Sequence, residues 1–154
     1  MKMTGQAGKR SLVGKQVYVG IDVHKESWHV TVRSDGEERF NGRIPAQYQS
    51  LKRVLERCRD CQIKVAYEAG PFGFWLLDRL VQDGIETIVV PPSLIPIESG
   101  NKVKTDKRDS RKLATLLERN MLTRVYVLTR EEREHRDLLR TRRQLVEHRN
   151  DVAR

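Results

Sequence analysis

Four acidic residues, far apart in the sequence, stand where carboxylate chemistry could take place. Asp22 closes the apolar run VYVGID, and Glu68 closes KVAYE. Asp106 and Asp109 lie inside KVKTDKRDSRKLATLLERN (102–120), one of the most basic stretches of the chain. Hard oxygen ligands select Mg²⁺ or Mn²⁺, and two such ions about 4 Å apart can activate a nucleophile and stabilise the leaving oxygen of a phosphodiester. We therefore predict that all four acids are metal ligands and catalytic residues.

Basic side chains accompany these acids and could hold the phosphate backbone of a nucleic acid. Lys plus Arg number 30 against 21 Asp plus Glu, a formal net charge of +9, and such a balance favours polyanionic partners. The cations would bind phosphate, while the metal offsets the repulsion between that phosphate and the acids. The candidate nucleic-acid-binding residues are His24, Lys25, Lys102, Lys104, Lys107, Arg108, Arg111 and Lys112.

Each acid taken singly has a simpler structural explanation. Asp106 could be the N-cap of a helix, because Asp satisfies free backbone N–H groups there. That role does not account for Asp109: on a helix both aspartates fall, within about 100° of arc, on the same face as three leucines. These are Leu113, Leu116 and Leu117. An acidic pair directed inward needs a compensating positive charge.

The elements that must position the acids follow from the hydrophobic pattern. Alternation predicts a strand over 16–24, and an Asp-Gly turn at 34–36 predicts a hairpin within 27–44. Pro45 then opens a predicted helix over about 46–60, and a strand follows at 64–68. The next predicted helix buries Phe74, Leu77, Leu80 and Val81 and is stopped by Gly84. The last predicted elements are a strand at 86–90, the helix of 102–120 and a short strand at 125–128. This β-β-β-α-β-α-β-α order predicts a mixed sheet with helices on both faces, as in the ribonuclease H-like fold.

The predicted sheet offers a place for the acids to meet. Sites in open α/β sheets collect beyond the carboxyl ends of the strands. If the strands ending in Asp22 and Glu68 are adjacent and parallel, their carboxylates share one edge, and the helix that begins near Asp106 brings two more.

A charged helix is predicted from Thr129 onward, without Gly or Pro. Apolar pairs repeat every seven residues, at Leu138-Leu139, Leu145-Val146 and Val152-Ala153. Such a seam either meets a partner helix or folds back on its own domain, and both remain open. The pattern reaches Arg154 without a stop signal, so we expect the polypeptide to continue.

Other functional classes find little support. Cys58 and Cys61 form a CxxC without a second ligand pair for zinc, and Cys58 continues an apolar helical stripe, so we predict a core residue. No apolar run is long enough for a membrane span and the start lacks a secretory apolar region, so we expect a cytoplasmic protein without a membrane partner.

Three motifs resemble those of the DEDD-type transposases of bacterial insertion sequences and related site-specific DNA invertases. They are GIDVHK (20–25), YEAG (67–70) and KTDKRDSRKLA (104–114), and the match covers nearly all of residues 16–128. The resemblance implies a RuvC-like domain within the ribonuclease H-like fold. It places the acids of the family on Asp22, Glu68, Asp106 and Asp109.

The resemblance also implies a function. This chain would be the N-terminal metal-binding catalytic domain of a transposase or site-specific recombinase, which cleaves and exchanges DNA strands together with a C-terminal domain holding a nucleophilic serine. That domain is absent here and Ser27, Ser93, Ser99 and Ser110 match no nucleophile motif, so we do not expect this chain to recombine DNA alone. The implied partners are DNA, a structured guide RNA, Mg²⁺ or Mn²⁺, and further copies of the chain through its C-terminal helix. The implied location is the bacterial cytoplasm, at the nucleoid.

On this interpretation the chain has three parts. Residues 1–14 form a flexible tail, residues 15–128 the RuvC-like catalytic domain, and residues 129–154 the start of a coiled-coil linker. Two alternatives remain: a stand-alone Mg-dependent structure-specific nuclease resembling a junction resolvase, or a non-catalytic RNA- or DNA-binding and dimerisation module. Mg²⁺-dependent cleavage of branched DNA by this chain would favour the nuclease, and recombination by full-length protein carrying Asp22→Ala would favour the module.

Overall fold

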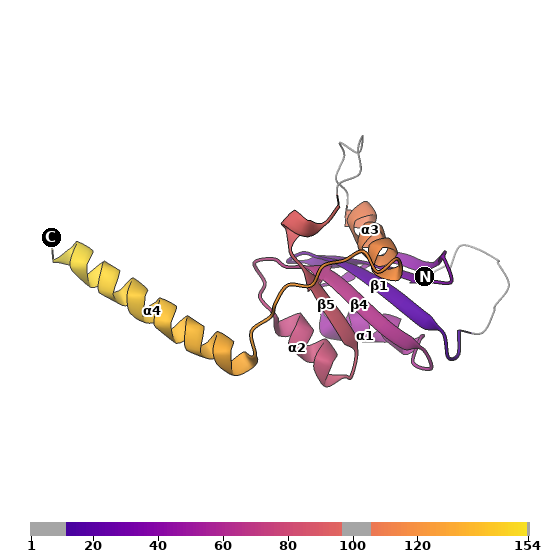
Figure 1. Ribbon diagram of the computed structural model, residues 1–154, viewed down its shortest axis with the longest axis horizontal. Helices are drawn as coiled ribbons and strands as arrows, with labels where there is room; N and C mark the ends of the chain where they lie inside the picture. The colour runs from indigo at the N-terminus through magenta and orange to yellow at the C-terminus, as the bar shows by residue number, and fades with distance from the viewer. Residues whose placement is uncertain (1–11, 97–105, 154) are drawn as a thin grey trace.

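Alternating apolar residues build one five-stranded sheet (Figure 1). The computed structural model describes residues 12–96 and 106–153, and only the backbone of Asp106. The strands are β1 (Gln16–Val23), β2 (Ser27–Ser34), β3 (Glu37–Pro45), β4 (Gln62–Glu68) and β5 (Glu86–Val90). The helices are α1 (Tyr48–Glu56), α2 (Trp75–Gln82), the 3₁₀ turn η1 (Pro92–Leu94), α3 (Asp106–Glu118) and α4 (Arg130–Val152). The predicted order of strands and helices through α3 is confirmed.

The sheet is mixed, with strand order β3-β2-β1-β4-β5. β1 pairs antiparallel with β2 and parallel with β4, which in turn pairs parallel with β5. The β2–β3 hairpin turns through Asp35 and Gly36, whose φ angles of 55° and 75° both lie in the left-handed region. Asp-Gly suits such a turn because both residues tolerate positive φ. The hairpin predicted from this dipeptide is therefore confirmed.

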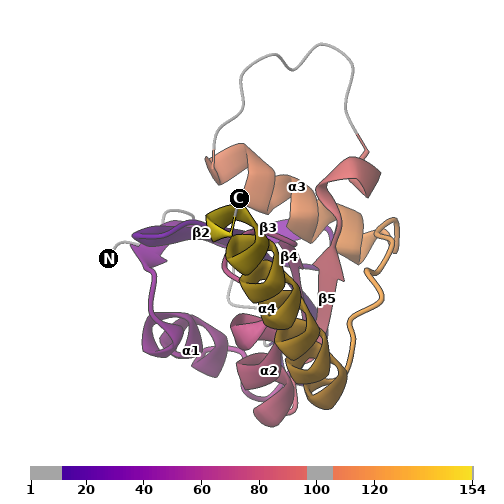
Figure 2. The ribbon, with the colours of Figure 1, turned by 90° about the vertical axis from the view of Figure 1, so that its left-hand side faces the viewer.

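Helices cover both faces of the sheet, α1 and α2 on one side and α3 on the other (Figure 2). The larger core lies on the α1/α2 side and includes Val17, Val19 and Ile21 of β1. A smaller cluster on the α3 side joins Ala66 of β4 to Leu117 of α3. The layered mixed sheet is an α/β fold consistent with the RuvC-like, ribonuclease H-like class, as predicted.

Several local predictions were wrong. Segment 125–128 is irregular, because only the Val125 N–H reaches the sheet edge, at the Val89 carbonyl (2.8 Å), and Tyr126 is 79% exposed. Pro45 ends β3 instead of opening a helix. In α2, Val81 is 57% exposed although it was predicted to be buried, and Leu76, which was not predicted, is buried. The stop at Gly84 (φ 73°) and the buried Cys58 are as predicted.

The N-terminal boundary of the domain is tied to the strands. Leu12 packs against the larger core, and the Gly14 N–H donates to the Asp60 carbonyl at 2.9 Å. Residues 1–11, most of the predicted tail, lie outside the described residues.

α4 projects away from the sheet domain (Figure 1). Its first turn is fixed by a capping box between Thr129 and Glu132. Arg133 ties this turn to α2 through an ion pair with Asp78 (Nη2 to Oδ1, 2.6 Å) and lies 5.3 Å from the Phe74 ring centroid. Beyond this contact the helix leaves its apolar seam exposed.

The described helices include none suited to a bilayer. Within residues 12–96 and 106–153, no helix is both long enough and apolar enough to cross a membrane.

Candidate metal-binding and catalytic site

Asp22 and Glu68 lie at the carboxyl ends of two neighbouring parallel strands, Asp22 as the last residue but one of β1 and Glu68 as the last residue of β4. The last registered pair of β1 and β4 is Ile21 with Tyr67, so the two acids follow side by side. Strands in a sheet lie about 4.8 Å apart. The Asp22 side chain is 15% exposed, and Glu68 is half-buried. The adjacency on which the predicted site depends is therefore present.

Both acids belong to the face of the sheet that α3 covers. Side chains alternate along a strand, so Asp22 shares a face with Gly20, and Glu68 shares one with Ala66. Gly20 lies directly against α3, and Ala66 packs in the cluster that contains Leu117 of α3.

The direction of α3 brings its first turn to the same edge. Thr31, the β2 neighbour of Gly20, contacts Ser110 early in the helix (Oγ1 to Oγ, 2.8 Å). Arg33, two residues further along β2, pairs with Glu118 at the end of the helix (Nε to Oε2, 2.9 Å). α3 therefore runs antiparallel to β1, and its start points toward the edge where β1 and β4 end.

Asp106 and Asp109 occupy that start. Asp106 is the first residue of α3, and Asp109 lies one turn on, half-buried, immediately before Ser110. The N-terminal end of a helix carries partial positive charge, which favours carboxylates. The topology thus gathers four backbone positions from distant parts of the chain at one edge of the sheet.

Gly20 makes the close approach of α3 possible. A Cβ placed on this glycine would lie 2.1 Å from the Ser110 carbonyl oxygen and 2.5 Å from the Ala114 nitrogen. Any side chain here would push α3 off the strand. This glycine opens the GIDVHK motif, so the motif contributes both an acid and the space beside it.

The backbone positions of the acids meet at this edge of the sheet, but the side chains that the structure describes do not all converge. Among the described residues, no group of three or more His, Cys, Asp and Glu is placed to hold a metal ion. The Asp106 side chain lies outside the description. Asp22 Oδ2 lies 2.9 Å from His24 Nε2, on a ring that is 51% exposed. The donor set, made of carboxylate oxygens, fits Mg²⁺ or Mn²⁺ by its chemistry.

The predicted cationic residues divide by environment. Lys102 and Lys104 lie outside the described residues. His24 and Lys25 are exposed between β1 and β2, Lys107 and Arg108 are exposed on α3, and Lys112 is half-buried.

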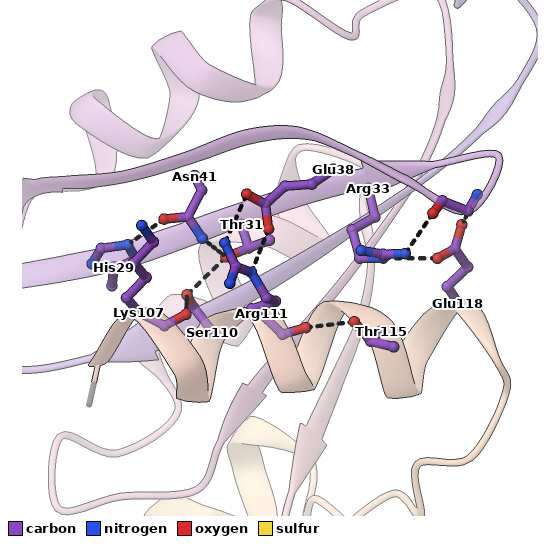
Figure 3. Close-up of polar contacts among 11 residues, drawn as sticks. His29, Thr31, Arg33, Glu38, Asn41, Lys107, Ser110, Arg111, Thr115 and Glu118 are labelled. Atoms are coloured by element: carbon purple, nitrogen blue, oxygen red, sulfur yellow. Dashed lines mark hydrogen bonds and ion pairs between the residues drawn. The ribbon is translucent and has the colours of Figure 1, made fainter. Parts of the chain in front are cut away.

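Arg111 already has an anionic partner. Its guanidinium binds both oxygens of Glu38, at 2.6 and 3.0 Å (Figure 3). The hydrogen bond that Arg111 donates to the Glu38 carboxylate raises the pKa of Arg111 above its usual value. A phosphate would have to compete with Glu38 for this side chain.

A small hollow adjoins Glu68 at the carboxyl end of β4. Phe72 and Trp75, 40% and 43% exposed, line it together with Val23, Gly70 and Leu76. Glu68 therefore borders an apolar, partly aromatic hollow at the end of β4.

A chain of polar side chains between the sheet and α3 was missed by sequence reasoning. His29, Asn41, Thr31 and Ser110 form it (Figure 3). Thr31 and Ser110 are 79 residues apart, and both are ordinary residue types for a strand and a helix. No sequence signal distinguishes them.

The fold and the site define a RuvC-like α/β domain with acids collected at one edge of its sheet. The chain belongs to the DEDD-type IS110 transposase family: the model of that family, described as "Transposase", matches residues 19–154.

Curated relatives agree with this assignment. The chain is 36% identical to a protein of Sinorhizobium fredii named as transposase y4qE, over 94% of this chain and 40% of that protein. It is 33% identical to the transposase for insertion sequence element IS1533 of Leptospira borgpetersenii, over 67% and 31%. A second S. fredii protein, named as transposase y4rJ, is 27% identical over 86% and 38%. The chain spans about two fifths of these relatives or less.

Proposed function

We propose that this domain is the metal-binding catalytic part of an insertion-sequence transposase and takes part in cleaving and exchanging DNA strands. One observation carries the proposal. Asp22 and Glu68 lie at the carboxyl ends of adjacent parallel strands, and the first turn of α3, which carries Asp106 and Asp109, begins at the same edge of the sheet. Together with membership of a transposase family, this gathering of acids supports metal-assisted phosphodiester chemistry.

Each residue then has a definite task. Asp22, Glu68, Asp106 and Asp109 would hold Mg²⁺ or Mn²⁺, which when bound activates the attacking oxygen and stabilises the leaving one. Lys107 and Arg108, exposed beside the acids, bind the phosphates that flank the scissile bond. The start of α3 adds positive potential for the anionic groups.

The rest of the reaction is proposed to need more than this chain. The relatives are more than twice as long, which leaves room for the nucleophilic serine domain that the family resemblance implies. We place strand exchange in an oligomer joined through α4, with DNA and a structured guide RNA as partners, in the cytoplasm at the nucleoid.

The test uses the full-length transposase. Asp22→Asn and Asp109→Asn each keep the shape of the side chain and remove a charged oxygen ligand, so we expect each to abolish recombination in a donor–target plasmid assay. Asp60→Asn is the matched control, because Asp60 is exposed just before β4, at the opposite edge of the sheet, and this variant should retain activity.

Two results would contradict the proposal. Full recombination by a folded Asp22→Asn variant would make the acid structural. Efficient Mg²⁺-dependent cleavage of branched DNA by the 154-residue chain alone would favour a stand-alone nuclease.

A further inference from the structure

The geometry points to a positioning device for the first turn of α3. We name as the α3 anchor the polar chain His29, Asn41, Thr31 and Ser110 (Figure 3). The anchor fixes Asp109 relative to Asp22, so Thr31 and Ser110 are positioning residues for the metal ligands. This inference rests on the proposed function of those acids.

The hydrogen bonds of the anchor run in one direction. His29 Nε2 lies 2.9 Å from Asn41 Oδ1, and Asn41 Nδ2 donates to Thr31 Oγ1 at 2.7 Å. Ser110 Oγ donates to the Lys107 carbonyl at 3.2 Å, which leaves Thr31 to donate to Ser110 Oγ across 2.8 Å. Each donor meets one acceptor, and the chain ends on a backbone carbonyl in the first turn of α3.

The anchor connects the two halves of the proposed site. His29 is the cross-strand neighbour of Asp22 in the β1–β2 ladder. At the other end, Ser110 follows Asp109 directly, and the Lys107 carbonyl lies on the same turn. Because Ser110 directly follows Asp109, any movement of the Thr31–Ser110 contact would also move the first turn of α3, which carries the proposed metal ligand Asp109.

Burial makes this contact demanding. Thr31 and Ser110 are both 0% exposed and lie in the interface between the sheet and α3. Helices and sheets usually pack against each other through apolar side chains in such an interface. Buried hydroxyls must be paired, and their bonds are directional, whereas apolar contact tolerates sliding and rotation. With Gly20 setting the distance, the anchor sets the rotation and the height of α3 along β1.

Other contacts hold the remainder of α3. Glu118 pairs with Arg33 at the far end, and Arg111 pairs with Glu38 on the flank. Loss of the anchor should therefore loosen the first turn while the rest of the helix stays in place.

The experiment compares three variants of the chain. Thr31→Val keeps the shape and removes the hydroxyl, and Thr31→Ser keeps the hydroxyl. Thr115→Val is the control, because among the described residues the Thr115 Oγ1 bonds only the Arg111 carbonyl of the same helix (2.8 Å). The measurements are amide hydrogen exchange at residues 110–113 without metal, and Mn²⁺ affinity from the spin-resonance signal of the free ion.

We expect Thr31→Val to exchange faster at residues 110–113 and to bind Mn²⁺ about tenfold more weakly, as loss of an outer-shell contact does. Thr31→Ser and Thr115→Val should resemble the unaltered chain in both measurements. If Thr31→Val fails to fold, Asn41→Ala on the edge strand β3 removes the donor to Thr31 and should accelerate exchange at the same amides by a smaller factor.

The outcomes separate the anchor from the proposed function. If the unaltered chain binds no Mn²⁺, the proposed function fails, and exchange alone judges the anchor: unchanged rates at 110–113 in Thr31→Val overturn it. If the chain binds Mn²⁺ and Thr31→Val binds equally well, the function stands and the anchor is overturned. Uniformly faster exchange along the whole chain would show ordinary destabilisation and also overturn it.

Discussion

Gly20 is the residue on which the packing of α3 most directly depends. Its φ is unexceptional, so the requirement is for space: the helix backbone occupies the volume of a Cβ, at 2.1 Å from the Ser110 oxygen. Overpacking a core typically costs about 1–3 kcal/mol, and more when the obstacle is backbone that cannot turn aside.

We expect Gly20→Ala to lower the free energy of unfolding by about 3 kcal/mol and to displace α3. Urea denaturation followed by circular dichroism measures this. Gly70→Ala is the control, because the nearest atom to its added Cβ is 4.0 Å away, and this variant should change stability little. Equal stability of the two variants would show that α3 adjusts without cost.

The individual acids could be identified from the sequence, but the side chains that position the acids could not. Asp22 and Glu68 were recognisable because each ends an apolar run. Thr31 and Ser110 carry no comparable pattern, because their partnership depends on a helix–sheet contact between residues 79 apart. The direction of α3 was likewise undetermined until Thr31 and Arg33 fixed both of its ends.

The helix α4 combines a leucine-rich seam with arginines in the same seam. In heptad terms the d positions are Leu138, Leu145 and Val152, which are 69%, 65% and 75% exposed, and the a positions are His135, Arg142 and Arg149. In a parallel pair of identical helices each a residue faces its own copy, so arginine would face arginine. The seam therefore disfavours a parallel pair of this segment. In the oligomer proposed above, two α4 helices would pair in antiparallel order, where a positions face d positions and each arginine meets an apolar residue.

Replacing both arginines should convert the seam into a strong self-association surface. We expect the double variant Arg142→Leu and Arg149→Leu to lower the dimer dissociation constant about tenfold or more relative to the unaltered chain. The reason is that like-charge contacts across an interface cost several kcal/mol. Sedimentation equilibrium measures the change.

The control removes the same charge from the other side of α4, through Arg140→Leu and Arg143→Leu. If both double variants associate equally, the gain reflects net charge and the heptad assignment is wrong.

The strands and helices were largely predictable because their patterns span several residues. The failures were short or marginal. The segment 125–128 has the composition of a strand, but within it only the Val125 N–H makes a backbone hydrogen bond to the edge strand β5. In α2 the predicted Phe74, Leu77 and Leu80 pack against the core, but the buried face is rotated so that Leu76 is buried and Val81 is exposed. Such rotations depend on how the preceding turn enters the helix, which periodicity over eight residues does not fix.

The molecule as a whole combines a net charge of +9 with a cluster of acids at one sheet edge. Binding to DNA should therefore be dominated by phosphate contacts and fall steeply with salt, since each contact contributes a slope of about −0.9 to log K against log salt. Residues near the acids should contribute to this slope, and residues at the opposite edge should not.

We expect Lys107→Gln to reduce the magnitude of that slope by about 1 on a short DNA duplex, measured by fluorescence anisotropy across a salt series. Arg59→Gln, which removes an exposed cation just before β4, at the end of the sheet opposite to the acids, should leave the slope unchanged. Equal effects of the two substitutions would indicate diffuse attraction without a defined binding face.

The tip of the β2–β3 hairpin has a practical consequence for protein engineering. A tight surface turn is the usual place to splice in a label or a fluorescent module. Here the Gly36 N–H donates to Glu118 Oε1 at 2.7 Å, and the Gly36 carbonyl accepts from Arg33 at 2.8 Å. The tip of the hairpin therefore holds the C-terminal end of α3 in place. An insertion between Asp35 and Gly36 would break these hydrogen bonds. A reporter placed there would therefore disturb the helix whose behaviour it was meant to record.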